Sequence, residues 1–133
     1  NVIANFFYRA MRNEDIVITG TGDETRDFNY VEDTVRGTIS AARTDSAIGR
    51  VFNIGSGRET KIGEIARRII EISGSKSQIV YTPRRNWDTV IRRVAAVKLA
   101  HKVFDFNATI DLDTGLRRYH AWLKRQDMGK CEW

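Results

Sequence analysis

The segments TRDFNYVEDTVRG, residues 25–37, and FNIGSG, residues 52–57, decide the fold class of this chain. The first places an Arg-Asp pair ahead of an aromatic, β-prone stretch and a Val-x-Asp helix entry. The second ends a β-rich run with Gly-x-Gly, a frequent strand exit. Strand and helix signals therefore alternate, and this alternation predicts an α/β fold.

Hydrophobic periodicity and turn residues predict the elements on either side of these segments. We expect a small mixed α/β domain of about five helices and short strands. The expected helices cover residues 2–12, a segment capped by Asp33, a segment from a Thr60 cap to Gly74, and residues 94–104 and 112–124. The expected strands are Asp15–Thr19, Phe28–Val31, Arg50–Ile54 and Ile79–Thr82.

Two helices and one strand should supply buried apolar faces. Val35, Ile39 and Ala42 share one side of the helix that Asp33 would cap, and isoleucines recur across residues 62–72. The run Arg50–Ile54 is continuously β-prone, as in strands that lie inside a sheet.

Length and composition bound the class of protein. A chain of 133 residues with 41% hydrophobic residues is expected to form a single domain, residues 1–133. The one cysteine, Cys131, allows no intramolecular disulfide, which favours a reducing, cytoplasmic setting. No apolar run approaches the roughly 20 residues that span a bilayer, so no membrane partner is expected. The net charge of +5 favours anionic partners without naming them.

The order of motifs resembles the C-terminal half of the NAD-dependent sugar-nucleotide epimerases and dehydratases, the extended short-chain dehydrogenase/reductase family. The resemblance continues to about Leu123. It implies a substrate-binding domain without its Rossmann core. Because the first residue is Asn1 rather than Met, we expect a truncated part of a larger two-domain enzyme, although tag removal or processing would give the same start.

The resemblance also suggests binding residues for a nucleotide-sugar diphosphate. Arg26, in the Arg-Asp pair, and Arg85, which opens RNWD, match the two arginines that grip the diphosphate of a UDP- or dTDP-sugar. Asp88 matches a carboxylate that assists at the ribose or orients the arginine, and Asn1 matches an Asn near the phosphates. Adjacent Arg84 is an alternative to Arg85.

Physical chemistry supports this pattern, because a guanidinium offers a planar fork of donors to a phosphate. The alternative role of Arg26 is a surface ion pair with Glu24 or Asp27. If Arg26 does bind the ligand, Asp27 could hold its side chain in place.

The family's hydride-transfer residues are missing from the sequence. It contains neither GxxGxxG nor Tyr-x-x-x-Lys. We therefore expect no catalysis by this chain alone and no cofactor bound by it, with NAD implied only for a full-length parent. His101 and His120 lie on separate helices without ligands at metal spacing, so we expect both to be partly exposed and predict no metal site.

The sequence is compatible with three functional hypotheses. The first is the nucleotide-sugar-binding portion of an epimerase or dehydratase. The second is a stand-alone or self-associating module. In resembling enzymes the segment VFNI, residues 51–54, joins the sheet of the other half, so here this segment and the apolar face of residues 62–72 need other cover. If 133 residues are the whole molecule, this need predicts a homodimer. The third, a small basic nucleic-acid-binding protein, is disfavoured because the aromatic residues fall on predicted core positions.

Overall fold

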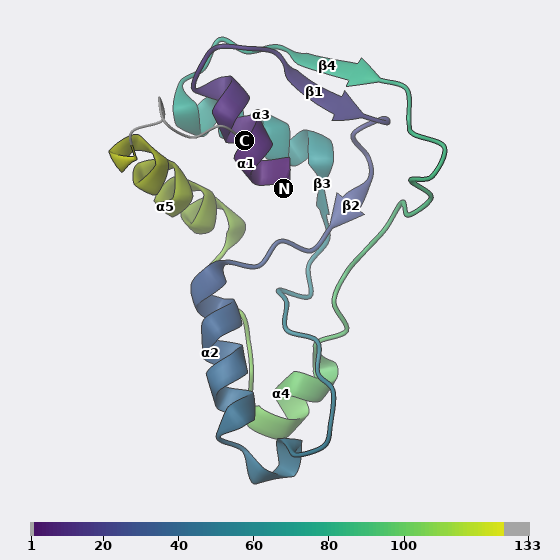
Figure 1. The fold of residues 1–133 in the computed structure, drawn as a ribbon, viewed down its shortest axis with the longest axis vertical. Coiled ribbons are helices and arrows are strands. Elements are labelled where there is room, and N and C mark those ends of the chain that lie inside the picture. Colours follow the sequence, from purple (N-terminus) through teal and green to yellow (C-terminus); the bar gives the residue numbers. More distant parts are fainter. Residues whose placement is uncertain (1, 127–133) are drawn as a thin grey trace.

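The computed structural model describes residues 2–126 and has the expected α/β architecture with five α-helices (Figure 1). The helices are α1 (Val2–Ala10), α2 (Val31–Ala42), α3 (Ile62–Ser73), α4 (Lys98–Phe104) and α5 (Leu112–Arg125), with a short 3-10 helix η1 (Asp45–Ala47). The strands are β1 (Ile16–Thr19), β2 (Thr25–Arg26), β3 (Thr60–Lys61) and β4 (Ile79–Thr82). The predicted strands at 15–19 and 79–82 are confirmed, as is the predicted helix at 112–124, to within a residue.

The strands form two small pairs. β1 and β4 are parallel, with Ile16 opposite Ile79, and β2 and β3 are antiparallel, with Thr25 opposite Lys61. The parallel pair lies at one end of the molecule, beside α1 and α3 (Figure 1). The connection from β1 to β4 includes β2, α2 and α3, so distant parts of the chain return to one place.

The main body, made of α1, β1, β4, α3 and α5, contains the hydrophobic core. Its fully buried side chains include Phe7, Ile16, Ile65 and Ile69. Ile62, Ile70 and Ile72 of α3 pack against this core. The apolar face of residues 62–72 is therefore covered by α1, β1 and α5 of the same chain, and the expectation that it needs other cover is wrong.

Local chemistry explains where three of the helices begin or end. Gly74 ends α3 with φ of 66°, as predicted, because a residue without Cβ adopts the left-handed conformation most easily. Asp105 takes the same conformation after α4, with φ of 50°. Asp111 caps α5 by accepting a hydrogen bond from the Thr114 amide at 2.9 Å.

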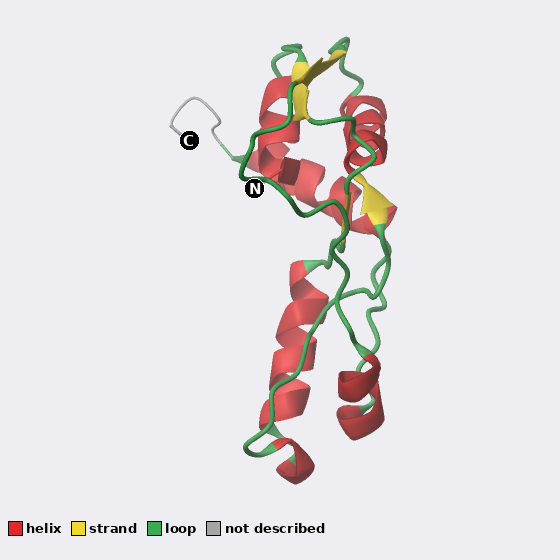
Figure 2. Cartoon of the chain, turned by 90° about the vertical axis from the view of Figure 1, so that its right-hand side faces the viewer, coloured by secondary structure: helices red, strands yellow, loops and turns green. Residues whose placement is uncertain are grey.

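The second part of the molecule, here called the arm, consists of α2, η1, residues 48–56 and α4. It extends away from the main body in two perpendicular views (Figures 1 and 2). Phe106 is buried against Gly37 of α2, where a Cβ would lie 2.9 Å from the Phe106 ring. The Phe52 and Phe104 rings meet edge to face at 4.9 Å. The arm therefore has a few close contacts rather than a broad core of its own.

Asp33 has a different role from the predicted helix cap. α2 begins two residues earlier, at Val31, and Asp33 lies inside its first turn with 1% of its surface exposed. Its carboxylate accepts hydrogen bonds from the Thr109 and Ile110 amides at 3.1 and 2.9 Å and pairs with Arg36. Burial raises the pKa of Asp33, but hydrogen bonds from Ile110, Arg36 and Thr109 outweigh burial and lower it. Asp33 thus fixes α2 to the segment that leads into α5.

The predicted apolar stripe on α2 is exposed, which corrects its expected burial. Val35 and Ile39 are 51% and 45% exposed, and Ala42 is exposed as well. The periodicity is real, but the described residues place no element over this face. Val31, at the start of the same stripe, is 63% exposed.

The predicted strand Arg50–Ile54 is likewise absent from the described residues. Val51 is 88% exposed, and the segment has no ladder partner among residues 2–126. A strand needs a neighbour for its backbone hydrogen bonds, and intrinsic β-propensity cannot supply one.

Three smaller expectations were wrong. Residues Phe28–Val31 form no strand, because the β-pairing is made earlier, at Thr25–Arg26. Thr60 lies in β3, and Lys61 rather than Thr60 is the N-cap of α3. α4 begins at Lys98 and not at Val94. In each case pairing or packing moved a boundary by a few residues.

His120 is buried rather than partly exposed. Only 6% of its surface is accessible, and its ring stacks on Phe7 with centroids 5.4 Å apart. Burial lowers the pKa of His120, and the positive charge of Lys124 lowers it further. Within residues 2–126, no helix has the length and apolar character to cross a membrane.

The buried His120 should make the stability of the fold depend on pH. Because its folded pKa lies below the unfolded value of about 6.5, the unfolded chain binds the proton more readily. Stability should be complete above about pH 6.5 and fall as the pH decreases below it. Urea unfolding between pH 7.5 and 5 measures this trend. His120→Gln should flatten it, while the exposed control His101→Gln should retain it; an unchanged slope in His120→Gln would exclude His120 as the cause.

Candidate functional site

One cavity of about 500 Å³ brings together the predicted binding residues that the structure describes. Arg26, Arg85 and Asp88 all line it, although they come from β2 and from the loop after β4. The other lining residues are Val2, Asn5, Phe6, Arg9, Val17, Ile18, Thr19, Glu24 and Ile62. The fourth predicted residue, Asn1, lies outside the described residues. The cavity thus lies between α1, the ends of β1 and β2, and the loop of residues 83–93.

Arg26 anchors this loop to β2. Its guanidinium donates hydrogen bonds to the carbonyl oxygens of Thr25 at 2.7 Å, Val90 at 3.1 Å and Ile91 at 3.3 Å. Its Nη2 also lies 3.9 Å from a carboxylate oxygen of Asp88. These contacts hold the Arg26 side chain in place. The side chain is still 24% exposed and lines the cavity.

Asp27 does not hold Arg26, contrary to one expectation. Its carboxylate accepts hydrogen bonds from the amide and hydroxyl of Ser56, from the Gly57 amide at 2.9 Å and from the Ala95 amide at 3.1 Å. One carboxylate therefore joins the segment after β2, the Gly-Ser-Gly turn and the end of the cavity loop. Sequence reasoning missed this arrangement, because the partners are 29 or more residues away.

The junction around Asp27 is closely packed. A Cβ added at Gly55 would lie 2.6 Å from the Ala95 Cβ and 2.8 Å from Asp27 Oδ2. These separations leave no room for a larger residue. The Gly-x-Gly signal at residues 55–57 therefore marks a close approach of three segments.

A second set of contacts fixes the other side of β2. The Thr25 amide donates to the Ile91 carbonyl at 2.9 Å, and Thr25 forms a parallel bridge with Arg92. Glu59 accepts hydrogen bonds from Arg92 at 2.7 and 3.0 Å and from the Thr25 hydroxyl at 2.9 Å. Hydrogen bonds from Arg92 and Thr25 lower the pKa of Glu59. The loop beside the cavity is thus paired to β2 like a short third strand.

Arg85 and Arg84 occupy different positions in this loop. The Arg85 guanidinium lies 6.0 Å from the centre of the Trp87 ring, which is 77% exposed. Arg84 lines a neighbouring cavity with Gly20 and Thr82, and its Nη2 is 3.7 Å from Asp88. Buried Nε and Nη2 atoms of Arg84 have no hydrogen-bond partner among the described residues. Only Arg85 of this pair lines the cavity that contains Arg26.

Sequence reasoning also missed Arg9. It lies one helical turn after Asn5 on α1, and both residues line the cavity. Arg9 Nη1 donates to the Asp15 carbonyl at 3.1 Å, which fixes the side chain near the start of β1. The i, i+4 spacing of Asn5 and Arg9 was the available signal. The cavity therefore presents Arg9, Arg26 and Arg85 beside the carboxylates of Glu24 and Asp88.

Glu24 is committed to the backbone. It is 7% exposed, and its carboxylate accepts hydrogen bonds from the Gly22 amide at 3.0 Å and the Thr21 amide at 3.4 Å. This contact shapes the turn after β1. It also leaves Asp88 as the more accessible acidic group in the cavity.

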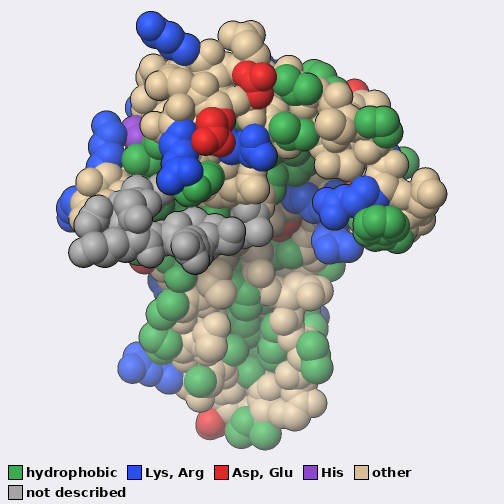
Figure 3. Space-filling model, turned by 45° about the horizontal axis from the view of Figure 1, so that its top comes forward, with side chains coloured by type: hydrophobic (Ala, Val, Ile, Leu, Met, Phe, Trp, Pro, Cys, Tyr) green, Lys and Arg blue, Asp and Glu red, His purple; other side chains and the backbone are tan. Residues whose placement is uncertain are grey.

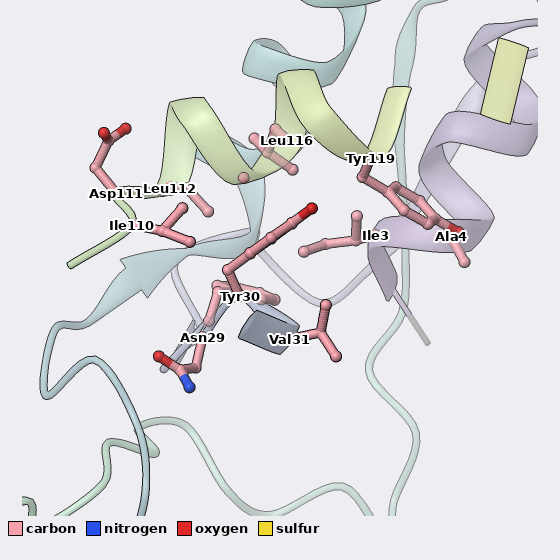
Figure 4. Close-up of a pocket in the computed structure, with 12 residues that line it drawn as sticks. Ile3, Ala4, Asn29, Tyr30, Val31, Ile110, Asp111, Leu112, Leu116 and Tyr119 are labelled. Carbon is pink, nitrogen blue, oxygen red and sulfur yellow. The ribbon is translucent and has the colours of Figure 1, made fainter. Parts of the chain in front are cut away.

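A separate apolar cavity of about 290 Å³ lies between α1, the start of α2 and α5. Its lining includes Phe28, Tyr30, Leu116 and Tyr119, with the Tyr30 side chain crossing below Leu116 (Figure 4). Burial raises the pKa of Tyr119. Of the predicted binding residues that the structure describes, Arg26, Arg85 and Asp88, none lines this cavity.

The described residues contain no group of three or more His, Cys, Asp or Glu side chains that could hold a metal ion. Cys131 lies outside the described residues.

Residues 1–55 match the model of the NAD dependent epimerase/dehydratase family. The resemblance inferred from the motif order is thereby confirmed at the level of this family match. The assignment to the C-terminal half of such an enzyme remains a proposal.

Individual relatives agree with the family match. The chain is 30% identical over 128 residues to UDP-N-acetyl-alpha-D-glucosaminuronate decarboxylase of Bacillus cytotoxicus, covering 92% of this chain and 40% of the relative. It superposes on an epimerase of Methanothermobacter thermautotrophicus with a TM-score of 0.91 and 40% identity, covering 93% of this chain and 37% of that one. It superposes on Thermotoga maritima UDP-glucose 4-epimerase, solved with UDP-glucose, with a TM-score of 0.87 and 30% identity, covering 94% and 40%. The chain therefore spans 37% to 40% of the length of these proteins.

Removing the Asp27 carboxylate should loosen the junction that supports the cavity loop. In Asp27→Ala, amide hydrogen exchange at Ser56, Gly57 and Ala95 should accelerate about tenfold or more, because a hydrogen bond to a charged acceptor contributes about 1.5–3 kcal/mol. Asp23→Ala, which removes a carboxylate paired with Lys61, is the control and should leave these amides unchanged. Equal exchange rates in Asp27→Ala and the unmodified protein would contradict this role.

Proposed function

We propose that this chain is the nucleotide-sugar-binding part of an NAD-dependent epimerase, dehydratase or decarboxylase acting on a UDP- or dTDP-sugar. The observation that carries the proposal is the convergence of Arg26 and Arg85 on one cavity. They come from separate segments and match the diphosphate-binding arginines of the resembling family. The two relatives named for UDP-sugar reactions support a UDP-sugar as ligand.

The chemistry of the cavity suits a diphosphate. A guanidinium forms directed, charge-assisted hydrogen bonds to phosphate oxygens, and two guanidinium groups can each take one phosphate. Arg26 is already positioned by carbonyl groups of the loop, which reduces the ordering cost of binding. Arg9 adds a third positive charge from α1.

The proposed role does not include NAD binding. GxxGxxG and Tyr-x-x-x-Lys are missing from this sequence, so its residues do not fit the nucleotide-binding and proton-transfer positions of the resembling family. We infer that NAD and the catalytic groups are supplied by another part of the enzyme and that this chain alone is not catalytic. The exposed stripe on α2 and the unpaired run at residues 50–54 suit contact with such a part.

Removing a single cavity arginine should weaken UDP binding. Arg85→Gln should raise the Kd for UDP about tenfold, because it removes a charge-assisted contact worth about 1.5 kcal/mol. Isothermal titration calorimetry of the 133-residue chain measures this change. Arg26→Gln should have at least the same effect, with an added loss of loop anchoring.

The matched control is Arg43→Gln, at the end of α2 in the arm. It removes the same charge but does not line the cavity, so the Kd should stay within twofold. If Arg85→Gln and Arg43→Gln had equal effects, a general charge effect would replace the proposed site.

The exposed stripe of α2 supports a second candidate function, a stand-alone or self-associating binding module derived from the same family. Val31, Val35 and Ile39 present apolar surface on one side of the helix. If the 133 residues are the whole molecule, a second copy would cover this face and form a homodimer. The oligomeric state of the isolated chain distinguishes the two candidate functions, because only the second predicts a homodimer.

If this second candidate is right, sedimentation velocity should show a dimer that Val35→Lys converts to monomer. Because Val35 is 51% exposed in one copy, the substitution should change the stability of the monomer by about 0.5 kcal/mol or less. Val80→Lys, at another exposed valine on β4, is the control and should leave the dimer intact. A single monomer peak at all concentrations would contradict self-association.

Nucleic-acid binding has less support. Arg68, Arg92, Arg117 and Arg118 each lie 2.7 or 2.8 Å from a carboxylate oxygen. On the face shown in Figure 3, Lys and Arg side chains form separate groups rather than one continuous band. A steeply salt-dependent affinity for DNA or RNA would favour this alternative.

A further inference from the structure

The two arginines that converge on the proposed site are held in different ways. Arg26 donates hydrogen bonds to three carbonyl oxygens, which fix its guanidinium. The Arg85 guanidinium makes no hydrogen bond and no ion pair with any residue in the described range 2–126. Its electrostatic partner in this part of the chain is the Trp87 ring, whose centre lies 6.0 Å from Arg85 Cζ. The position of the Arg85 guanidinium therefore depends on one aromatic side chain.

A tight turn brings Arg85 and Trp87 together. The Asp88 amide donates a hydrogen bond to the Arg85 carbonyl oxygen at 3.0 Å, and Trp87 lies inside the turn that this bond closes. Trp87 does not have the positive φ that would strain its backbone. The loop itself is fixed to β2 through the pairing of Arg92 with Glu59. The Trp87 ring thus stands on a fixed backbone beside a flexible cationic side chain.

A ring in this position can lower the cost of binding an anion. The face of an aromatic ring attracts a cation, tryptophan does so most strongly, and 6.0 Å is the outer limit of this attraction. A long side chain without a partner must be ordered when a ligand binds, and that loss of freedom weakens binding. Because the ring restricts the positions of the Arg85 guanidinium beforehand, part of this loss is avoided.

Resting on the proposed function above, we propose that Trp87 is a positioning residue, whose ring holds the Arg85 guanidinium at the cavity and so strengthens binding of the diphosphate. Arg85 lines the cavity and Trp87 does not, so the effect of Trp87 passes through Arg85. The alternative is direct stacking of the Trp87 ring on the base of a nucleotide. Direct stacking would act only on ligands that have a base.

The contact can be tested before any ligand is added. The ring current of tryptophan moves the NMR signals of protons above its face upfield, so the side-chain protons of Arg85 should resonate upfield of those of Arg43 in the arm. In Trp87→Ala the Arg85 signals should return to the positions of Arg43. Arg85 signals that are unshifted and do not respond to Trp87→Ala would overturn the proposal.

Binding measurements test the consequence of the contact. Trp87→Ala should raise the Kd for inorganic pyrophosphate and for UDP about three- to fivefold, which corresponds to the loss of an exposed cation–π contact. Trp87→Phe keeps an aromatic ring and should stay within twofold of the unmodified protein. Calorimetric titrations of the 133-residue chain at one ionic strength measure these values.

The matched control is Ile91→Ala, which shortens another exposed apolar side chain of the same loop and should leave both Kd values within twofold. Because Trp87 is 77% exposed, Trp87→Ala should leave the midpoint of thermal unfolding nearly unchanged, as most surface substitutions do. Equal effects of Ile91→Ala and Trp87→Ala would assign the weaker binding to a general loosening of the loop and would overturn the proposal.

A double-mutant cycle tests whether Trp87 acts through Arg85. In the Arg85→Gln background, Trp87→Ala should change either Kd less than twofold, because no guanidinium remains to be positioned. An undiminished effect in this background would show that Trp87 acts independently of Arg85. An effect on UDP that is absent with pyrophosphate would assign Trp87 to stacking on the base. Either result would overturn the positioning role.

The failure of this inference differs from the failure of the proposed function. If the unmodified protein binds both ligands and Trp87→Ala binds them with the same Kd, the role of Trp87 is wrong while the diphosphate site stands. If neither the unmodified protein nor Trp87→Phe binds pyrophosphate or UDP, the proposed function fails and the role of Trp87 fails with it.

Discussion

The carboxylate of Asp27 is the interaction on which the candidate site depends. It accepts hydrogen bonds from Ser56, Gly57 and Ala95, so it joins three segments that are far apart in sequence. Its neighbour Arg26 then faces the cavity and anchors the loop that carries Arg85. Without this junction, β2 and the loop would be held together by the Arg26 hydrogen bonds to Val90 and Ile91 and by the contacts of Thr25 with Ile91 and Arg92. The position of the cationic groups thus depends on a partly buried polar network as well as on the hydrophobic core.

The arm imposes a second constraint, because its packing is incomplete within the described residues. Asp33 and Phe106 attach α2 to the rest of the chain, while Val35 and Ile39 remain exposed on the opposite side. An exposed apolar stripe, and a β-prone run without a pairing strand among the described residues, are typical of surfaces that another chain or domain covers. In the binding proposal another part of the enzyme covers the α2 stripe, and in the self-association proposal a second copy of this chain covers it.

Much of the fold could be predicted from local sequence, but the site could be predicted only in part. The spacing of isoleucines before Gly74 located α3, because a helix needs only its own backbone partners. The run Arg50–Ile54 failed as a strand prediction, since no strand among the described residues pairs with it. Arg26, Arg85 and Asp88 were found through family resemblance, and the structure places them in one cavity. The bonds of Asp27 and the contribution of Arg9 could not be predicted, because they depend on which distant segments meet.

The most direct test of the central claim is an amide NMR titration of the ¹⁵N-labelled chain with UDP. Binding at the proposed cavity should perturb the amides of Thr19, Arg26, Arg85 and Asp88, with saturation at a common Kd. The apolar cavity around Tyr30 and Leu116 should remain unaffected. Perturbations confined to that apolar cavity, or none at millimolar UDP, would contradict the account.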